Sequence, residues 1–412
     1  MSRRTSGQIV AAIDIGTTKS ACLIGQITDS GLKVIGVGQA PHKGVRQGLI
    51  VNIEGVSQAI TKAKDEAELM AGEEIHSVWL GVSGSHIRSF SSDGMVAIKN
   101  KEVAENDVER VIEAACAVAI PSDRQVMHVV PNEYKIDDQK GIRDPIGMSG
   151  VRLEASVHII TASQSAVQNM MKCCESVGLK VEGLVLQQLA SAVAVANEDE
   201  KNMGVVVADI GGGTCDLITY IQGSVAHTAM IPVGGQNFTQ DISIGLKTTQ
   251  AAAEELKKHF GCVFNEMIDP NETIEVESVS GRKSRTLKRS DLTEVLSARA
   301  EETLNLIRRQ IDDQGHTEQI GSGLVLTGGG SHLDGLISMA EFELDFPVRR
   351  GLPENVSGLA EIVKSAQYAT GVGLLIYGYE QRMKSRTPES VATNEGSFFS
   401  GIRRRLNELF GE

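Results

Sequence analysis

Residues 204–223, GVVVADIGGGTCDLITYIQG, combine an apolar stretch, an aspartate, a glycine-rich turn and a second apolar stretch. The β-branched residues on both sides of the turn predict two neighbouring strands. The same order occurs in residues 8–27, QIVAAIDIGTTKSACLIGQI, where Asp14 stands 195 residues before Asp209. A repeat of this length predicts two α/β domains of common ancestry, each of which opens on a strand, an Asp-Ile-Gly turn and a second strand.

Glycine-rich turns of this kind have two interpretations. One is a tight turn between paired strands, because glycine accepts the backbone angles that such turns need. The other is an anion site, in which successive backbone N–H groups approach phosphate oxygens without a Cβ in the way. The second is favoured, since both turns carry threonine hydroxyls and a third glycine-rich turn, LTGGGSHLDG at residues 326–335, follows another apolar stretch. The expected phosphate-binding residues are Gly16, Thr17, Thr18, Lys19, Gly211, Gly212, Gly213, Thr214, Gly328, Gly329, Gly330 and Ser331.

Two aspartates, Asp14 and Asp209, stand at the ends of the strands that lead into the first two turns. Two carboxylates that face each other across a cleft would hold a hydrated Mg²⁺, which takes one or two carboxylates together with substrate phosphates. The sequence has neither a GxxxxGK[ST] motif nor a GxGxxG motif after its first strand, so it does not resemble a P-loop or dinucleotide-binding protein. We therefore expect a phosphate-bearing ligand and Mg²⁺ between two similar domains.

The composition bounds the class of protein. The chain has 412 residues and a net charge of −13, a balance that argues against binding of nucleic acid, which requires a basic face. It has no apolar signal-peptide core near its start, and no run of about 18 apolar residues that could span a bilayer. Its six cysteines form no CxxC pair, so we expect reduced and mostly buried thiols in a cytosolic protein.

The sequence between residues 85 and 161 differs from its surroundings. Before it, Asn52 and Gly72 are the expected N-cap and terminal glycine of one helix. The segment itself combines alternating stretches with a helix over AENDVERVIEAACAVAI that Pro121 should end. The strand–helix rhythm then resumes, so the segment predicts a small α/β unit inserted into the first domain. The acidic stretch ANEDEKNMG marks the expected junction with the second domain.

The three turns, in this order, resemble the phosphate-1, phosphate-2 and adenosine motifs of the superfamily that includes actin, sugar kinases and the DnaK-type chaperone ATPases. The resemblance implies two ribonuclease-H-like domains with ATP between them, joined by a helix that QQLASAVAVA matches. In the chaperones a catalytic Glu precedes this helix, whereas Gln187 stands here. A Gln orients a water but is no general base, so the resemblance implies slow hydrolysis at most, with Gln187 and Asp209 as the catalytic candidates.

The same resemblance implies further nucleotide contacts. Glu254 and Lys257 match the position where relatives touch the ribose and the adenine, although a solvated helix face is the alternative interpretation. Gly234 and Gly235, in IPVGGQNF, resemble an additional turn on the phosphate side.

Within the superfamily, the chain resembles the FtsA family of bacterial cell-division proteins along nearly its whole length. The stretches that carry this resemblance include GVGQAPHKGVRQG, HVVPNEYKIDDQKGIRDPIGMSGVRLEASVHIIT, GLKVEGLVLQQLASA and AHTAMIPVGG. The resemblance implies a protein that binds ATP, polymerises head to tail, binds the C-terminal tail of the tubulin-like FtsZ and ties it to the cytoplasmic face of the membrane at the septum, together with other division proteins.

The expected organisation is an actin-like pair of α/β domains with an FtsA-type insert. The first domain takes residues 1–84 and 162–200, and the insert takes 85–161. The second domain takes 201–240 and 305–383, interrupted by a small subdomain at 241–304 that forms the nucleotide lid and the FtsZ-binding side. A flexible linker over 384–397, rich in Ser, Thr, Pro, Asn and Glu, then leads to a terminal segment, 398–412.

The small subdomain holds a basic stretch, GRKSRTLKR at residues 281–289, with no acidic residue. In an acidic chain such a stretch could attract an acidic tail and speed its arrival. A solvated hairpin is the alternative interpretation. The candidate FtsZ-binding residues are Arg285, Lys288, Arg289 and, on the following helix, Arg299.

The terminal segment, SFFSGIRRRLNELFGE at residues 397–412, combines large apolar residues with three consecutive arginines. On a helix that turns by about 100° per residue, its six apolar residues fall within one arc of about 120°. Two arginines flank that arc, and the third lies opposite. A docked terminal helix and a membrane-surface helix are the two interpretations, and the flexible linker and flanking arginines favour the membrane. The expected membrane-contacting residues are Phe398, Phe399, Ile402, Arg403, Arg405, Leu406, Leu409 and Phe410.

Two other classes of function remain open from the sequence. One is a PilM-like, actin-fold partner of a pilus-assembly system, which shares the inserted unit but has no need of a membrane helix of its own. The other is a metabolic kinase, which would need a catalytic Asp in a deep sugar site, and the sequence offers no such motif.

Overall fold

Two β-sheets with the same strand order form the centre of the molecule. The computed structural model describes residues 9–279 and 283–384. The first sheet runs in the order β11-β6-β1-β2-β3-β19, and the second in the order β14-β13-β12-β17-β18. Both sheets share five strands, three antiparallel ones followed by two parallel ones. The first sheet has a sixth strand, β19, which pairs in parallel with β3. The first sheet comprises β1 (Ile9–Ile15), β2 (Lys19–Thr28), β3 (Gly31–Pro41), β6 (Ser77–Val82), β11 (Lys180–Leu186) and β19 (Ser357–Gly358), and the second β12 (Val205–Ile210), β13 (Cys215–Ile221), β14 (Ser224–Ile231), β17 (Leu324–Thr327) and β18 (Val348–Arg350).

The register of the opening hairpins repeats as well. Asp14 pairs with Ala21 across β1 and β2, and Asp209 pairs with Asp216 across β12 and β13. Each turn is closed by the same backbone hydrogen bond, from the N–H of the first glycine to the carbonyl three residues on, at 3.0 Å in the first hairpin and 2.8 Å in the second. The predicted duplication of a ribonuclease-H-like domain is therefore confirmed.

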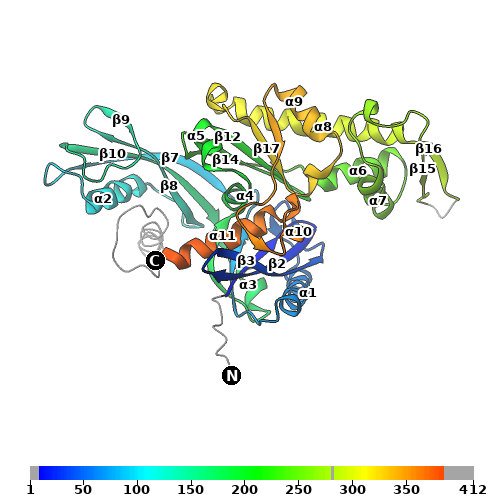
Figure 1. Cartoon of the computed structure of the whole chain (residues 1–412), viewed down its shortest axis with the longest axis horizontal. Coiled ribbons are helices and arrows are strands. Elements are labelled where there is room, and N and C mark those ends of the chain that lie inside the picture. Colours follow the sequence, from blue (N-terminus) through cyan, green and yellow to red (C-terminus); the bar gives the residue numbers. More distant parts are fainter. Residues whose placement is uncertain (1–8, 280–282, 385–412) are drawn as a thin grey trace.

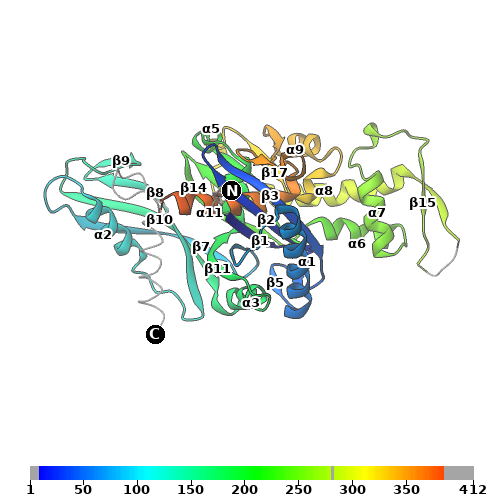
Figure 2. The same ribbon diagram turned by 60° about the horizontal axis from the view of Figure 1, so that its bottom comes forward.

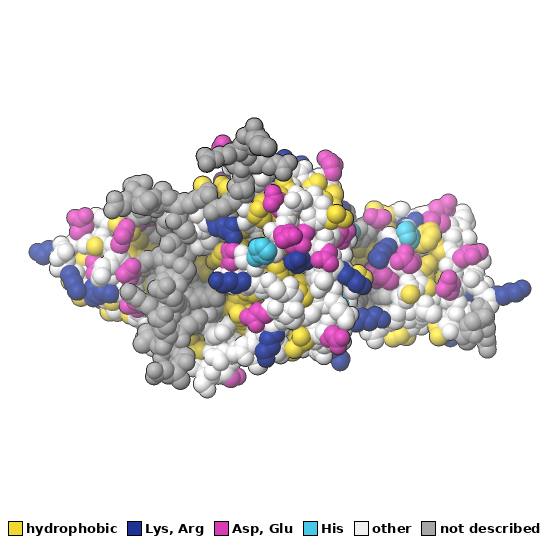
Figure 3. All heavy atoms as spheres, turned by 90° about the horizontal axis from the view of Figure 1, so that it is seen from below, with side chains coloured by type: hydrophobic (Ala, Val, Ile, Leu, Met, Phe, Trp, Pro, Cys, Tyr) yellow, Lys and Arg dark blue, Asp and Glu magenta, His cyan; other side chains and the backbone are white. Residues whose placement is uncertain are grey.

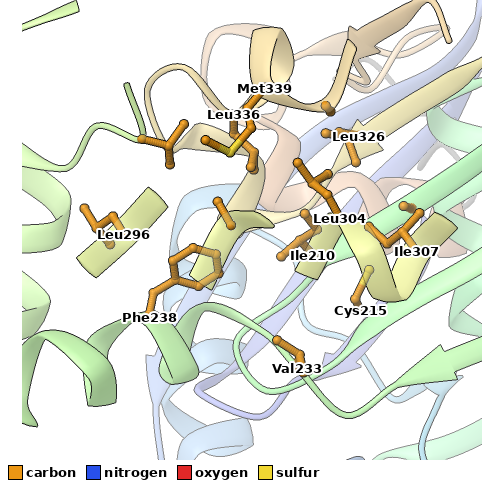
Figure 4. Packing of buried hydrophobic residues seen from close by; sticks show 14 of the residues in the cluster. Ile210, Cys215, Val233, Phe238, Leu296, Leu304, Ile307, Leu326, Leu336 and Met339 are labelled. Carbon is orange, nitrogen blue, oxygen red and sulfur yellow. The ribbon is translucent and has the colours of Figure 1, made fainter. Parts of the chain in front are cut away.

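Helices cover both faces of each sheet, which gives five layers. Between the sheets lie α4 (Gln187–Val195) and α11 (Ala369–Lys384), which share one apolar core with residues of both sheets. The outer face of the first sheet carries α1 (Ile53–Ala71) and α3 (Gln164–Glu175) (Figure 2). The outer face of the second carries α8 (Arg289–Asp312) and α9 (Leu336–Leu344). Figure 4 shows Leu304, Ile307, Leu336 and Met339 of these helices beside Ile210 and Leu326 of the sheet.

The two ends of α1 lie at the residues that the sequence predicts. The Asn52 side chain accepts a hydrogen bond from the N–H of Gly55, which satisfies one of the free donors at the helix start. Gly72 follows the helix with a φ of 68°, in the left-handed region that favours glycine at this position. Both predicted ends of the helix are confirmed.

Residues 88–163 form a separate sheet with its own core, at one end of the elongated molecule (Figure 1). Its order is β7-β10-β8-β9, and α2 packs against it. The helix ends at Cys116 rather than at Pro121, because the chain turns away before the proline. The elements are β7 (Arg88–Ala97), α2 (Glu105–Cys116), β8 (Arg124–Ile136), β9 (Gln139–Ile142) and β10 (Arg152–Ser163).

The opposite end of the molecule holds a small helical unit and a two-stranded hairpin (Figure 1). Its elements are α6 (Gly235–Gly245), α7 (Gln250–Phe260), β15 (Thr273–Val276) and β16 (Arg285–Lys288), and the short remaining elements of the chain are β4 (Val45–Arg46), β5 (Leu49–Ile50), α5 (Glu198–Met203) and α10 (Ala360–Val363). The long helix α8 begins beside the hairpin and runs back to the second sheet.

The expectation that all of 305–383 belongs to the second domain is wrong for its last part. From Ser357 the chain returns to the first sheet, where β19 pairs with β3. The helix α11 then packs in the core between the sheets, beside β1, β2 and α4. Its residues are apolar around most of its circumference, and a helix of this kind is buried on several sides rather than on one.

The expected linker, apart from Lys384 at the end of α11, and the expected membrane segment 398–412 lie outside the described residues. Within the described ranges, no helix has both the length and the apolar content needed to cross a bilayer. On the described part of the face in Figure 3, acidic and basic side chains are intermixed.

The contact between α1 and β3 predicts a sensitive position. Gly38 lies under α1, and a Cβ added there would overlap the carbonyl oxygen of Ala63 and lie 2.8 Å from the N–H nitrogen of Ala67. Gly38→Ala should therefore destabilise the fold by roughly 1–3 kcal/mol, as overpacking does, seen as a lower midpoint of thermal unfolding. The matched control is Gly329→Ala, whose added Cβ would meet nothing within 4 Å. Equal midpoints for the two variants would contradict the prediction.

Candidate functional site

The two Asp-Ile-Gly turns face one another between the sheets. A Cβ added at Gly212 would lie 2.8 Å from Oγ1 of Thr18, and one added at Gly213 would lie 2.9 Å from Oγ1 of Thr17. No side chain other than hydrogen fits at that separation, so the glycines let the second turn approach the threonines of the first. The structure thus brings together two turns that the sequence separates by 195 residues, and we call this place the inter-domain site.

Two further glycine-containing segments pack against the second Asp-Ile-Gly turn. The N–H groups of Gly235 and Gln236 donate to the carbonyls of Gly211 and Gly212, at 2.9 and 2.7 Å. The third glycine-rich turn lies against the other side, since Gly328, at a φ of 80°, stands directly against the carboxylate of Asp209. All four predicted glycine turns therefore meet at the inter-domain site.

Asp14 and Asp209 lie close enough for their charges to interact. Burial and the neighbouring Asp209 raise the pKa of Asp14 to about 7. Burial also raises the pKa of Asp209, while hydrogen bonds from Ser191 and Thr370 act in the opposite direction. Such a pair of carboxylates favours either a shared proton or a bound cation.

The connecting helix α4 supplies the partners of these carboxylates. Gln187 Nε2 donates to Asp14 Oδ1 at 2.9 Å, and Ser191 Oγ donates to Asp209 Oδ2 at 2.6 Å. Thr370 of α11 adds a second bond to Asp209 Oδ2, at 3.0 Å. The sequence pointed to Gln187 but missed Ser191 and Thr370, because only the packing of both helices between the sheets places them there.

A third carboxylate, Asp216, was also missed. It is 6 % exposed and accepts hydrogen bonds from Gln188 Nε2 at 2.6 Å and from Ser83 Oγ at 2.8 and 2.9 Å. Burial raises its pKa to about 7, with Asp209 and Asp14 adding to the rise. A signal was present in the sequence, since a four-residue turn between two strands sets Asp216 opposite Asp209.

Two predicted ligands bond to other groups of the chain, although the Lys19 ammonium is still close enough to Asp14 to lower the pKa of that carboxyl. The Lys19 ammonium contacts Gln39 Oε1 at 2.8 Å and Gln367 Oε1 at 3.2 Å, and lies 4.7 Å from the centre of the Tyr368 ring. The hydroxyl of Ser331 donates to the carbonyl of Gly328 within its own turn, at 2.8 Å.

Glu254 and Lys257 lie beside the second turn. Lys257 Nζ donates to the carbonyl of Gly235 at 2.9 Å and pairs with Glu254 Oε2 at 2.7 Å. Thr239 Oγ1 bonds to the same Glu254 oxygen at 2.5 Å. These contacts place both side chains next to a glycine of the site, and not on a helix face turned wholly to solvent.

The four basic candidates lie at the far end of the molecule, and three of them have partners inside the chain. Arg285 donates to the carbonyl of Leu246, and Arg289 pairs with Glu272 at 2.8 Å. Arg299 pairs with Asp241 and Glu302. Lys288 is exposed on β16.

The polar groups of the inter-domain site can be compared with the needs of the two ligands that the sequence predicts, Mg²⁺ and phosphate. Two facing carboxylates whose pKa values are raised suit a hydrated Mg²⁺, which needs only one or two protein carboxylates. Among the described residues, no three or more His, Cys, Asp or Glu side chains converge closely enough to enclose a metal. Glycine turns with threonine hydroxyls beside the carboxylates suit phosphate groups. The six cysteines, by contrast, are buried and free, as predicted.

Two sheets that share the same five-strand topology, with facing Asp-Ile-Gly turns, define the actin-like class of fold. Solved structures agree. The chain resembles the PilM–PilN type IV pilus biogenesis complex with a TM-score of 0.66 and 16% identity, over 90% of this chain and 98% of the other. It resembles MreB5 of Spiroplasma citri bound to ADP with a TM-score of 0.57 and 13% identity, over 92% and 99% of the chains.

Sequence comparison identifies the family within this class. Residues 84–161 match the model of the SHS2 domain inserted in FtsA, and residues 206–373 match the model of the cell division protein FtsA. The chain is 45% identical to FtsA of Pseudomonas aeruginosa over 92% of its length and 91% of the relative's. It is 42% identical to FtsA of Neisseria meningitidis, over 96% of both chains, and 38% identical to FtsA of Escherichia coli K12, over 100% of both. The chain belongs to the FtsA family of cell-division proteins.

The alternative of a PilM-like pilus protein is not favoured. The likeness to PilM is one of fold, at 16% identity. The identities to FtsA proteins of three organisms extend over nearly the whole chain.

The raised pKa of Asp14 predicts a pH dependence of stability. Between pH 4 and 7 the folded chain keeps a proton on Asp14 that the unfolded chain has lost, so this group's contribution to stability falls as the pH rises. The side chain of Asp14→Asn cannot ionise, so this variant should stabilise the ligand-free chain at pH 8 by about 1–3 kcal/mol, a range that allows for solvent screening of the carboxylate. At pH 4.5, where Asp14 is protonated in the folded chain, the gain should be much smaller. Chemical unfolding at both pH values measures this, and an equal gain at both would contradict it.

Proposed function

We propose that the chain is an ATP-binding, actin-like division protein that ties FtsZ filaments to the cytoplasmic face of the membrane at the septum. The proposed binding of ATP is supported above all by one observation: two glycine turns that carry threonine hydroxyls face each other beside Asp14 and Asp209. Membership of the FtsA family supports the role in division.

The residues of the inter-domain site have distinct tasks in this proposal. The amides of the glycine turns and the hydroxyls of Thr17, Thr18 and Thr214 bind the phosphates of ATP. Asp14 and Asp209 hold Mg²⁺, which supplies positive charge beside the phosphates. Glu254 and Lys257 are next to Gly235 and contact the ribose and the adenine. Fold relatives from Spiroplasma citri solved with ADP and with AMPPNP support this assignment.

Hydrolysis is slow at most, and the nucleotide acts mainly as a switch. The amide of Gln187 donates to the carboxylate of Asp14 and cannot accept a proton from water as a general base. ATP and ADP would instead change the contacts between the two domains around the inter-domain site and its helices.

The two ends of the tether lie in different parts of the chain. The segment 398–412, with an apolar arc flanked by Arg403 and Arg405, binds the anionic membrane surface. The end of the molecule around β15 and β16 receives the acidic FtsZ tail, and Lys288 is its most accessible candidate. One short helix binds weakly, so head-to-tail assembly of many copies supplies avidity.

Mg–ATP binding should depend strongly on Asp209. Asp209→Ala removes one of the two metal-side carboxylates and leaves Ser191 and Thr370 without their acceptor. We expect equilibrium titration to show an affinity for Mg–ATP at least tenfold weaker. Asp241→Ala, an acidic residue of α6 paired with Arg299, is the control and should bind normally. Unchanged affinity in Asp209→Ala would refute the assignment of the site.

Membrane attachment should require the terminal segment. The full chain should sediment with anionic liposomes and carry FtsZ with it, whereas a chain lacking residues 398–412 should bind Mg–ATP but leave both proteins in the supernatant. Two point variants give a finer comparison. Phe410→Glu changes a residue on the apolar arc, and Asn407→Glu changes a residue about 180° from the first residue of that arc. Both variants add one negative charge. The first should abolish sedimentation and the second should weaken it only slightly. Sedimentation of the truncated chain would refute the tether.

A further inference from the structure

Asp216 joins three parts of the molecule. It lies on β13 of the second domain and accepts hydrogen bonds from Ser83 Oγ at 2.8 and 2.9 Å, from Gln188 Nε2 at 2.6 Å and from Thr214 Oγ1 at 3.3 Å. All four side chains are more than nine-tenths buried. Ser83 belongs to the first domain and Gln188 to the helix between the domains, so one carboxylate connects both domains and α4.

Ser83 stands where the first domain gives way to the insert. It follows β6 directly, and β7, the first strand of the insert, begins five residues later at Arg88. The short segment between them is held by several hydrogen bonds, among them those from the N–H of Ser85 to the carbonyl of Gln47 at 3.3 Å and from Arg124 to the carbonyl of His86 at 2.8 Å. The Ser83 hydroxyl, which donates to the carboxylate of Asp216, connects this segment to the second domain.

Thr214 stands on the other side of Asp216, in the glycine turn of the inter-domain site. Its hydroxyl bonds to Asp216 Oδ2, and its carbonyl closes the turn through the N–H of Gly211 at 2.8 Å. A ligand that takes up the Thr214 hydroxyl changes the bonds of Asp216 directly.

We propose that Asp216 is a positioning residue that couples occupation of the inter-domain site to the anchoring of the insert through Ser83. The proposal rests on the proposed binding of nucleotide and Mg²⁺ at that site. Its direction follows from the hydrogen bonds. When a phosphate takes up the Thr214 hydroxyl, Asp216 keeps Ser83 and Gln188 as its donors, the Ser83 bonds strengthen, and the segment at residues 83–88 becomes more ordered. The insert then takes a more fixed position relative to the two domains.

Hydrogen exchange on the full chain tests this coupling, with Mg²⁺ and the ATP analogue AMPPNP as the probe. In the unmodified protein, AMPPNP should slow amide exchange severalfold in residues 84–97. Ser83→Ala should bind AMPPNP within about threefold of the unmodified protein yet lose most of this slowing. Asp216→Asn keeps the shape of the side chain and replaces one acceptor oxygen by an NH₂ donor, so it should fold and also lose the slowing.

Ser92→Ala is the matched control. The Ser92 hydroxyl donates to the carbonyl of Ala115 at 2.7 Å inside the insert, so the change removes one hydrogen bond with no connection to Asp216. This variant should keep the full response to AMPPNP. Loss of the response in Ser92→Ala, or the full response in Ser83→Ala, would overturn the proposal.

The test also separates this inference from the proposed function. Titration that shows AMPPNP binding, combined with unchanged exchange in residues 84–97 of the unmodified protein, would overturn the coupling alone. Absence of AMPPNP binding to the unmodified protein would overturn both.

Discussion

Asp14, Asp209 and Asp216 approach one another between two sheets, where little solvent is available to stabilise their negative charges. The helix α4 supplies most of the hydrogen bonds that stabilise them. Gln187, Gln188 and Ser191 of α4 each donate a hydrogen bond to a different aspartate. The start of α4 is also the positive end of the helix dipole. The first turn and a half of one short helix therefore has polar partners on both sheets, beside the apolar core that the sheets share.

This arrangement explains why the site is built from a duplicated element but is not symmetric. The two hairpins share their register and their turn geometry, yet Ala21 occupies in the first copy the position that Asp216 occupies in the second. The extra carboxylate makes the second hairpin the one that reaches across to Ser83. A duplicated fold gave two equivalent turns, and single substitutions then gave them different neighbours.

Much of the fold and the centre of the site could be predicted from the sequence, because they rest on local patterns. The repeat of strand, Asp-Ile-Gly and strand predicted both sheets, and Asn52 and Gly72 predicted the ends of α1. What could not be predicted depends on contacts distant in sequence. The return of α11 to the first sheet is decided by which core has room for an apolar helix. The partners of Arg285, Arg289 and Arg299 are likewise set by packing, so two arginines of the basic run bond within the chain, while Lys283 and Lys288 of the same run are exposed.

The return of α11 has a mechanical consequence. Its last turn is pinned to the first sheet, where Arg382 pairs with Glu182 at 2.6 Å and donates to the carbonyl of Ile9. The opposite end of the molecule is connected to the second sheet by α8, a helix of 24 residues. A pull applied between the end of α11 and the hairpin of β15 and β16 is therefore carried from one sheet to the other across α4 and the facing turns. Tension along the long axis would bear directly on α4 and the facing turns, the part of the molecule where Asp14, Asp209 and Asp216 lie.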